Sequence, residues 1–279
     1  MKVYQIKILN FIGHFLTILE NNCNLYKLYI SKNKLKTLEL LNNLNYPTTK
    51  LIPKSFITDD DYIVCKPIYG KCGKGIYFSK PNNIIPSKIF NNQNYIFEKY
   101  EYGRHYRVVF YRNKINTVYE RIIPKVIGNN RDTIQKLVQK KNKERKLNNQ
   151  IYLDLNNNDP NYIPKDGQII ECTQLCHYLN GGSIKYLNID DIPKSTVGLL
   201  TKLSQELNLN IFAIDIIASD LRRSYKYQNV FCINELEYCN DWGTHFIFND
   251  KFSRLCKLII LKWFLVFGFF ILFFYDKIR

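Results

Sequence analysis

The chain has 279 residues, of which 46% are hydrophobic and 15% aromatic, so it can bury a large core and is not intrinsically disordered. The formal net charge at pH 7 is +16, which favours an anionic partner. The lysines are scattered apart from one run, so codon bias explains the charge equally well, and we expect no specific nucleic-acid partner.

The cysteines favour a reducing compartment. The eight cysteines contain no Cys-x-x-Cys pair, and several lie inside apolar, strand-like runs. "CTQLCH" lacks a second ligand pair at usable spacing, which argues against zinc. The N-terminal segment lacks a small-residue cleavage site, so we expect a cytoplasmic protein with reduced, packed cysteines.

The N-terminal part is predicted to be a helix followed by strands. Residues 33–44 have leucines three positions apart behind Asn33, a residue type that caps helices. Residues 62–67 and 75–79 are predicted to form a hairpin around a glycine-rich loop. Two more stretches, 94–103 and 106–124, have strand composition, and the second turns at Asn113 and Lys114.

The C-terminal part alternates helices and strands. A helix with a basic outer side is expected from Asp132 onward, with Asp132 as its cap. Residues 147–165 read as a loop, "QIIECTQLCHYLNGGS" leads from a strand into a Gly-Gly turn, and 194–208 reads as a helix capped by Ser195. Strands are predicted at 211–220 and 230–241.

The last two strands bear carboxylates in unusual places. Asp215 stands in a run of branched apolar residues, where a carboxylate is costly unless a cation pairs with it. Glu235 and Glu237 are two positions apart and so point to one side of a strand. The three predict a Mg²⁺ site, and without a cation they should raise one another's pKa. The alternative is a pair of solvent-facing glutamates.

The loop after Lys66 suits an anion. Glycines allow the backbone N–H groups to approach a ligand closely, and lysines add positive charge. The spacing of Gly70, Gly73, Lys74 and Gly75 fits neither a Walker A loop nor a dinucleotide fingerprint. Phosphate binding and an ordinary hairpin with solvated lysines both remain open.

The order of these parts resembles the ATP-grasp ligases, most closely the ATP-grasp module of cyanophycin synthetase and bifunctional glutathione synthetase. The resemblance runs over roughly residues 30–248. It lies in "ISKNKLKTLELLNNLNYPTT", "YIVCKPIYGKCGKGIYF", "IFEKYEYGRHYRVVFYRNKINTVYERIIPKVIGNNRDTIQKLVQKKNKER", "HYLNGGS", "NLNIFAIDII" and "INELEYCNDWGTH".

The resemblance implies an α+β, two-lobed ATP-grasp fold with mixed and antiparallel sheets and a nucleotide between the lobes. The expected parts are a helical lead-in (1–50), a small lid lobe (51–104), a large lobe (105–250) with a basic helical insertion (128–148), and a hydrophobic tail (251–279).

The resemblance also implies an ATP- and Mg²⁺-dependent carboxylate–amine ligase that forms an amide bond on an amino acid or peptide through an acyl phosphate. Lys66 would hold the α- and β-phosphates, and Arg107 and Arg121 would neutralise phosphate or substrate carboxylate. The remaining roles fall to a lid (Gly70, Gly73, Lys74, Gly75), an adenine hinge (Glu98, Lys99, Tyr100), a ribose position (His105) and the metal ligands (Asp215, Glu235, Glu237).

Three positions depart from the family pattern. The family usually has an acidic residue where His105 stands, and asparagine where His177 and Glu237 stand. The alternative function is therefore a catalytically inactive homologue that binds a nucleotide or another polyanion. The sequence names neither the acid nor the amine, and a homo-oligomer remains open.

The C-terminal tail lies outside the resemblance. It has an uninterrupted apolar run from Trp263 to Tyr275, and residues 258–275 are at the lower limit of length for a membrane span. The sequence leaves open a membrane anchor formed by 258–275 and a terminal helix buried in the core.

Overall fold

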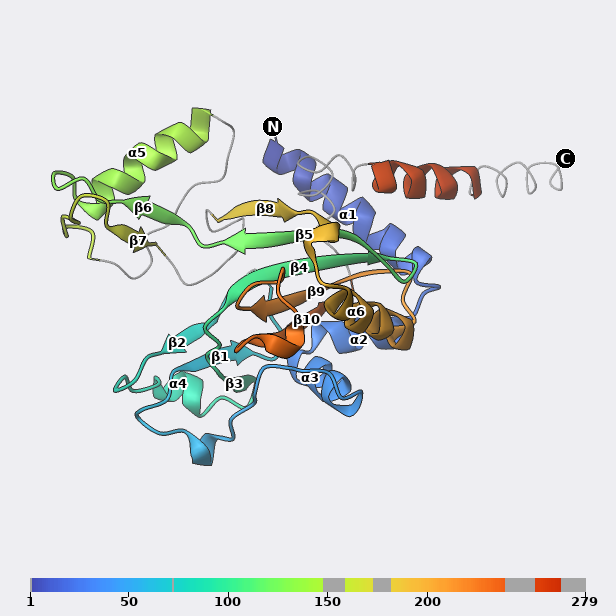
Figure 1. Cartoon of the computed structure of the whole chain (residues 1–279), viewed down its shortest axis with the longest axis horizontal. Coiled ribbons are helices and arrows are strands. Elements are labelled where there is room, and N and C mark those ends of the chain that lie inside the picture. Colours follow the sequence, from blue (N-terminus) through green and yellow to red (C-terminus); the bar gives the residue numbers. More distant parts are fainter. Residues whose placement is uncertain (1, 72, 148–158, 173–181, 239–253, 267–279) are drawn as a thin grey trace, which may run out of the picture.

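The computed structural model describes residues 2–71, 73–147, 159–172, 182–238 and 254–266. The strands of this part form a three-stranded, a five-stranded and a two-stranded sheet. The first two sheets lie next to each other with helices around them, as Figure 1 shows.

The chain begins with three helices, α1 (Lys2–Glu20), α2 (Leu25–Lys32) and α3 (Lys34–Asn43). The Asn33 side chain accepts a hydrogen bond from the backbone N–H of Lys36 at 3.0 Å, which confirms the predicted helix and its cap. Leu38 and Leu41 of α3 are fully buried, as their spacing predicts.

The three-stranded sheet has the order β2-β1-β3 and is antiparallel throughout. Its strands are β1 (Ile63–Pro67), β2 (Tyr77–Ser79) and β3 (Tyr95–Lys99). The short helices η1 (Lys54–Phe56) and α4 (Ser87–Phe90) lie beside it. The predicted hairpin is confirmed, with a shorter second strand, and the strand expected at 94–103 ends at Lys99.

The five-stranded sheet has the order β10-β9-β4-β5-β8, and every neighbouring pair is antiparallel. Its strands are β4 (Arg104–Tyr111), β5 (Lys114–Ile122), β8 (Ser183–Leu187), β9 (Ile211–Ala218) and β10 (Phe231–Glu237). The β4–β5 turn lies at Arg112 and Asn113, one residue earlier than predicted, because both have the positive φ that a two-residue hairpin loop requires (47° and 61°).

One face of this sheet packs against α6 (Lys194–Leu207), whose Leu200, Leu203 and Leu207 are fully buried. The predicted cap at Ser195 is wrong: Pro193 precedes the first helical residue, so Ser195 already lies in the first turn. There its hydroxyl oxygen lies 2.9 Å from that of Ser224.

The opposite face is covered along part of its length by α1 and by a helix over 254–266. Leu16 of α1 and Ile259 of the C-terminal helix pack with Val109 and Ile211 of the sheet. The Glu20 carboxylate joins the two helices, since it accepts from Lys262 Nζ at 2.6 Å and Trp263 Nε1 at 2.9 Å.

The described part of the tail is therefore a helix packed on the core. Among the helices that the structure describes, none combines the length and the apolar character that a bilayer crossing needs. Residues 267–275 of the predicted tail segment lie outside the described residues.

A third unit contains β6 (Lys125–Ile127), β7 (Ile169–Glu171) and the basic helix α5 (Ile134–Leu147). The predicted cap at Asp132 is wrong, because the backbone N–H of Lys136 donates to Thr133 Oγ1 at 3.3 Å. Asp132 instead pairs with Lys136 and Lys140. The strand predicted at the start of "QIIECTQLCHYLNGGS" is confirmed by β7, whereas the short strands β6 and β8 were not predicted.

Candidate functional site

A cavity of about 520 Å³ lies between the three-stranded and the five-stranded sheet. It is lined by nearly every residue that the sequence singled out, from both sheets and the loop between β1 and β2. These are Lys66, Gly70, Gly73, Lys74, Glu98, Lys99, Tyr100, His105, Arg107, Arg121, Asp215, Glu235 and Glu237. Gly75 is not among the lining residues.

Strand alternation brings the polar side chains to one face. Val109 of β4 belongs to the face covered by α1, and Arg107 and His105 lie two and four residues earlier on the same side. Asp215 of β9 pairs directly with Arg107, and Glu235 of β10 pairs with Asp215. A row of charged residues therefore crosses three strands beyond the end of the apolar cluster.

A β-bulge in β10 sets the direction of the glutamates. The pairing register with β9 shifts between Ile233 and Glu235, which leaves Asn234 as the extra residue. Because of this shift, Ile233 lies in the core shared with α6, while Glu235 and Glu237 line the cavity. Without the extra residue, the three side chains would share one face.

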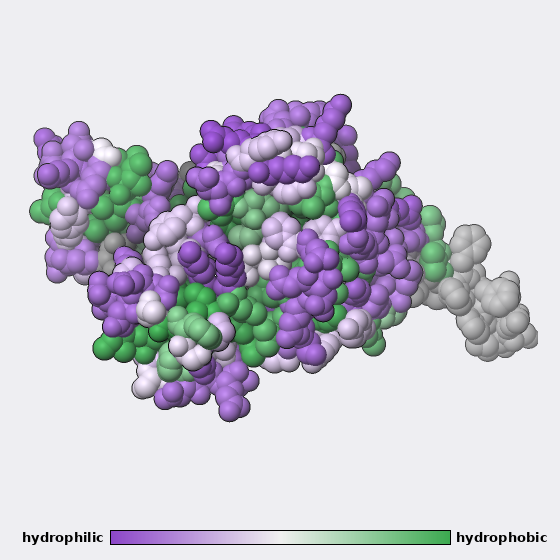
Figure 2. All heavy atoms as spheres, turned by 60° about the horizontal axis from the view of Figure 1, so that its bottom comes forward, coloured by the Kyte–Doolittle hydropathy of each residue, from purple (hydrophilic) through white to green (hydrophobic). Residues whose placement is uncertain are grey.

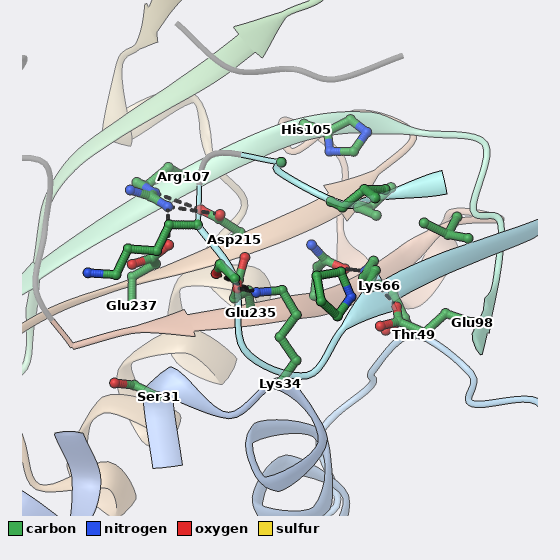
Figure 3. Close-up of a pocket in the computed structure, with 18 of the residues that line it drawn as sticks. Ser31, Lys34, Thr49, Lys66, Glu98, His105, Arg107, Asp215, Glu235 and Glu237 are labelled. Atoms are coloured by element: carbon green, nitrogen blue, oxygen red, sulfur yellow. Dashed lines mark hydrogen bonds and ion pairs between the residues drawn. The ribbon is translucent and has the colours of Figure 1, made fainter. Parts of the chain in front are cut away.

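The three predicted metal ligands do come together. Asp215, Glu235 and Glu237 each offer one carboxylate oxygen, and these atoms all lie within 4.8 Å of one another. Figure 3 shows the three side chains converging at one end of the cavity, with Arg107 beside them. Oxygen atoms at this spacing fit the ligand preference of Mg²⁺.

Two arginines already neutralise the buried aspartate. Arg107 donates to both carboxylate oxygens of Asp215, from Nε at 2.7 Å and from Nη2 at 2.9 Å. Arg121 adds a third bond of 2.9 Å. Burial would raise the pKa of Asp215, but Arg107 and Arg121 outweigh it and hold that pKa well below its usual value.

The neighbouring Glu237 behaves differently. Burial, together with the negative charges of Glu235 and Asp215, raises the pKa of Glu237, although Arg107 contacts it at 3.0 Å. The expectation that the carboxylates raise one another's pKa is therefore confirmed for Glu237 and wrong for Asp215, because local sequence patterns do not show how close the arginines lie.

Lys66 connects the two sheets. Its ammonium group donates to Glu98 Oε2 on β3 and to Asn234 Oδ1 on β10, both at 2.7 Å. Lys66 and Glu98 are 7% and 1% exposed, so the charges compensate each other in a nearly dry environment. The bulge at Asn234 thus supplies a lysine partner that sequence reasoning missed.

Two further lining residues were also missed. Lys34 of α3 pairs with Glu235 at 2.7 Å. The Thr49 hydroxyl is buried and has no hydrogen-bond partner in the described part of the chain. Figure 3 places Thr49 close to Lys66 and Glu98. The sequence held only a weak signal for Lys34, its position at the start of the predicted helix.

The glycine loop, residues 68–76, closes one side of the cavity. Gly73 and Gly75 have φ values of 73° and 77°, a conformation that side-chain-bearing residues rarely adopt. Lys71 and Lys74 in this loop are exposed. Cys72 lies outside the described residues.

The predicted hinge has an aromatic support. The ring of Tyr100 stacks on Tyr62 with centroids 4.1 Å apart and an interplanar angle of 7°. Nearby, burial and then the charge of Arg121 lower the pKa of His105 to about 4. At neutral pH the His105 imidazole is therefore uncharged.

Two cyanophycin synthetases match part of the sequence. That of Trichormus variabilis is 26% identical over 181 residues, which cover 58% of this chain and 20% of the relative. That of Synechocystis is 24% identical over 190 residues, with 60% and 22% covered. The chain thus spans about a fifth of the length of the curated relatives it matches. No family model matches the sequence.

A solved structure gives the fold. The ATP-grasp ligase PsnB, complexed with a minimal precursor, aligns with a TM-score of 0.51 at 13% identity over 86% of this chain and 62% of PsnB. The chain has the ATP-grasp fold. The predicted α+β architecture is thereby confirmed, and the cavity with its carboxylates lies between two sheets of this fold.

Proposed function

We propose that the chain is an ATP- and Mg²⁺-dependent carboxylate–amine ligase acting on an amino acid or peptide. One observation carries the proposal: a buried lysine and three convergent carboxylates line a single cavity between the two sheets. The relatives named above support it, because they are a synthetase of cyanophycin and a ligase bound to a precursor.

The residues fit a divalent cation in charge as well as in distance. Arg107, Arg121 and Lys34 already balance the three carboxylates, so a cation alone would leave the cluster positive. The phosphates of ATP bring compensating negative charge, which favours binding of the cation and ATP together. Asp215, Glu235 and Glu237 would hold Mg²⁺, which offsets charge on the transferring phosphoryl group when bound.

The reaction proceeds in two steps. The substrate carboxylate attacks the γ-phosphorus of ATP, and ADP leaves; the amine then attacks the acyl phosphate, loses a proton and releases phosphate. Lys66 would contact the α- and β-phosphates, and the glycine loop with Gly70, Gly73, Lys74 and Gly75 would cover them. Arg121 would turn toward the phosphate or carboxylate that carries the developing charge.

The adenosine part of ATP would lie against the hinge. Glu98, Lys99 and Tyr100 would face the adenine, and Tyr62 would keep the Tyr100 ring in place by stacking. His105 would contact the ribose as a neutral imidazole, which can accept one hydrogen bond and donate another.

A second function has a specific observation in its favour. Both oxygens of Asp215 are engaged by arginines, so a chain that had lost catalysis could keep this ion-pair network and still bind a nucleotide or another polyanion. The departures at His105 and Glu237 point the same way.

The experiment is ADP release from Mg²⁺·ATP in the presence of a panel of amino acids and short acidic peptides. The ligase is supported if one acid–amine pair raises ADP release above the ATP-only rate and if Glu235→Gln removes that increase. ATP binding without any stimulated release across the panel would favour the inactive homologue.

The cellular context also stays a proposal. We expect the chain to act in the cytoplasm, and we retain a membrane contact through 258–275 and a homo-oligomer as hypotheses for fractionation and sizing experiments.

A further inference from the structure

The corner between α2 and α3 contacts the glycine loop at three points. The backbone N–H of Lys34 donates to the Ile68 carbonyl at 3.0 Å, and the Asn33 amide donates to the Tyr69 hydroxyl at 2.9 Å. The Lys34 ammonium group donates to the Gly70 carbonyl at 3.1 Å. This corner therefore holds the loop before any ligand is bound.

The same ammonium group contacts a candidate metal ligand. Lys34 Nζ lies 2.7 Å from Glu235 Oε1, and the two side chains are 12% and 21% exposed. An ammonium group at this distance from a carboxylate forms a charged ion pair, and its remaining hydrogen-bond donor reaches the Gly70 carbonyl. One cation thus joins the loop of the three-stranded sheet to the carboxylate cluster of the five-stranded sheet, as Figure 3 shows for Lys34 and Glu235.

A divalent cation competes with this contact. Mg²⁺ binds oxygen ligands at about 2.0–2.1 Å, so a cation on Glu235 would lie close to an ammonium group that already touches the same carboxylate. Two positive charges at that separation repel each other strongly in a partly buried site. The ammonium group must then leave Glu235, and the contact with Gly70 weakens with it.

We propose that Lys34 is a positioning residue that couples metal binding to the glycine loop: it holds Glu235 and Gly70 together when no divalent cation is present, and cation binding releases the loop. The inference rests on the metal site of the proposed function. Once Lys34 has left Glu235, the loop is free to close over phosphates, so closure follows the arrival of the cation.

The first test measures Mn²⁺ binding by the electron paramagnetic resonance of the free ion, in full-length protein without ATP. Lys34→Met removes the competing charge, so Mn²⁺ should bind about fivefold more tightly, a modest ion-pair effect. Lys34→Arg should restore the wild-type affinity. The matched control is Lys36→Met, whose lysine lies on the same helix over the Tyr29 ring, 5.2 Å from its centroid.

The second test measures how accessible the loop is to a protease. Trypsin cleaves after lysine, and Lys71 and Lys74 are exposed in the loop, so mass spectrometry can follow cleavage at these two sites. In wild type and Lys36→Met, Mn²⁺ should accelerate cleavage severalfold. In Lys34→Met, cleavage should be fast without Mn²⁺ and unchanged by it.

The outcomes separate this inference from the proposed ligase. If wild type binds Mn²⁺ while Lys34→Met matches it in affinity and in cleavage, the coupling is wrong and the metal site stands. If no variant binds Mn²⁺ and ADP release is absent, both ideas fail. Thermal melting of each variant identifies any that has unfolded; if Lys34→Met is unfolded, Lys34→Gln, which also removes the charge, supplies the comparison.

Discussion

One face of the five-stranded sheet has two halves with opposite chemistry. At one end, Val109 and Ile211 lie under apolar side chains of α1 and the helix 254–266. Two to four residues further along the same strands, Arg107 and Asp215 lie against a cavity and are held by hydrogen bonds. One alternation pattern can therefore build a core and a charged site in succession, depending on what covers the sheet.

The largest effect is expected in the apolar half. Deleting residues 254–279 uncovers Val109 and Ile211 and removes Leu255 and Ile259, both nearly fully buried. We expect a loss of about 5 kcal/mol in the free energy of unfolding, on the usual scale for buried aliphatic side chains. Urea denaturation measures it, and deletion of 267–279 alone serves as the control. A stable protein that only leaves the membrane fraction after the long deletion would instead support an anchor.

The polar half should be nearly as sensitive. Asp215→Asn leaves Arg107 and Arg121 with a weaker partner in a buried site, so we expect about 3 kcal/mol lower stability and no stimulated ADP release. Mutual repulsion of the three carboxylates, which the sequence alone suggests, would instead make the variant more stable. Asp190→Asn makes the same chemical change at an exposed position. An Asp215→Asn protein more stable than wild type in urea would show that the arginines do not compensate the carboxylate.

Binding of ATP in the cavity should stabilise the folded protein. Saturating Mg²⁺·ATP should stabilise the native state by about 2.7 kcal/mol at a hundredfold excess over Kd, which raises the melting temperature by several degrees. Lys66→Ala should abolish this ATP-dependent rise, whatever its own baseline. Equal rises in both proteins would show that the phosphates bind elsewhere.

Protonation of His105 should make the stability of the polar half depend on pH. Its folded-state pKa of about 4 lies below the unfolded value of 6.5, so the unfolded chain binds the proton more readily and stability falls as pH drops below 6.5. Between pH 7 and pH 5 this term amounts to about 2 kcal/mol. His105→Gln should lose that part of the pH dependence in urea titrations at the two pH values. Parallel profiles for variant and wild type would contradict the half-buried, neutral imidazole.

The smallest effect is expected at Glu237. The fold raises its pKa, so a neutral amide removes an unfavourable charge while losing one contact to Arg107 at 3.0 Å. Glu237→Asn should therefore change stability by less than about 1 kcal/mol and retain ADP release. If wild type is inactive and Glu237→Asn or His105→Glu gains activity, the scaffold has lost its chemistry at these positions.

Much of this arrangement could be predicted from local patterns. The period of two in 230–241 correctly placed Glu235 and Glu237 on one side, and the apolar run around Asp215 correctly marked a buried carboxylate. Short strands such as β6 were not predicted, because three residues are too few to show the alternation of a strand.

What the sequence did not reveal depends on contacts between distant segments. Lys66 and Asn234 are separated by 168 positions, and the bulge that leaves Asn234 as the extra residue of β10 exists only relative to β9. The role of Lys34 likewise requires the loop and β10 to lie beside the α2–α3 corner. No local pattern encodes such distances.

The pairing of β4 with β9 also has a consequence for synthesis on the ribosome. Tyr111 pairs with Ile211, so about a hundred residues must be translated before β4 meets that neighbour. At ordinary elongation rates, the strand presents an open edge for roughly 5 to 20 s. An open, apolar strand edge is a template for pairing with other chains. The nascent protein therefore has a defined interval in which a chaperone that shields strand edges would raise its yield.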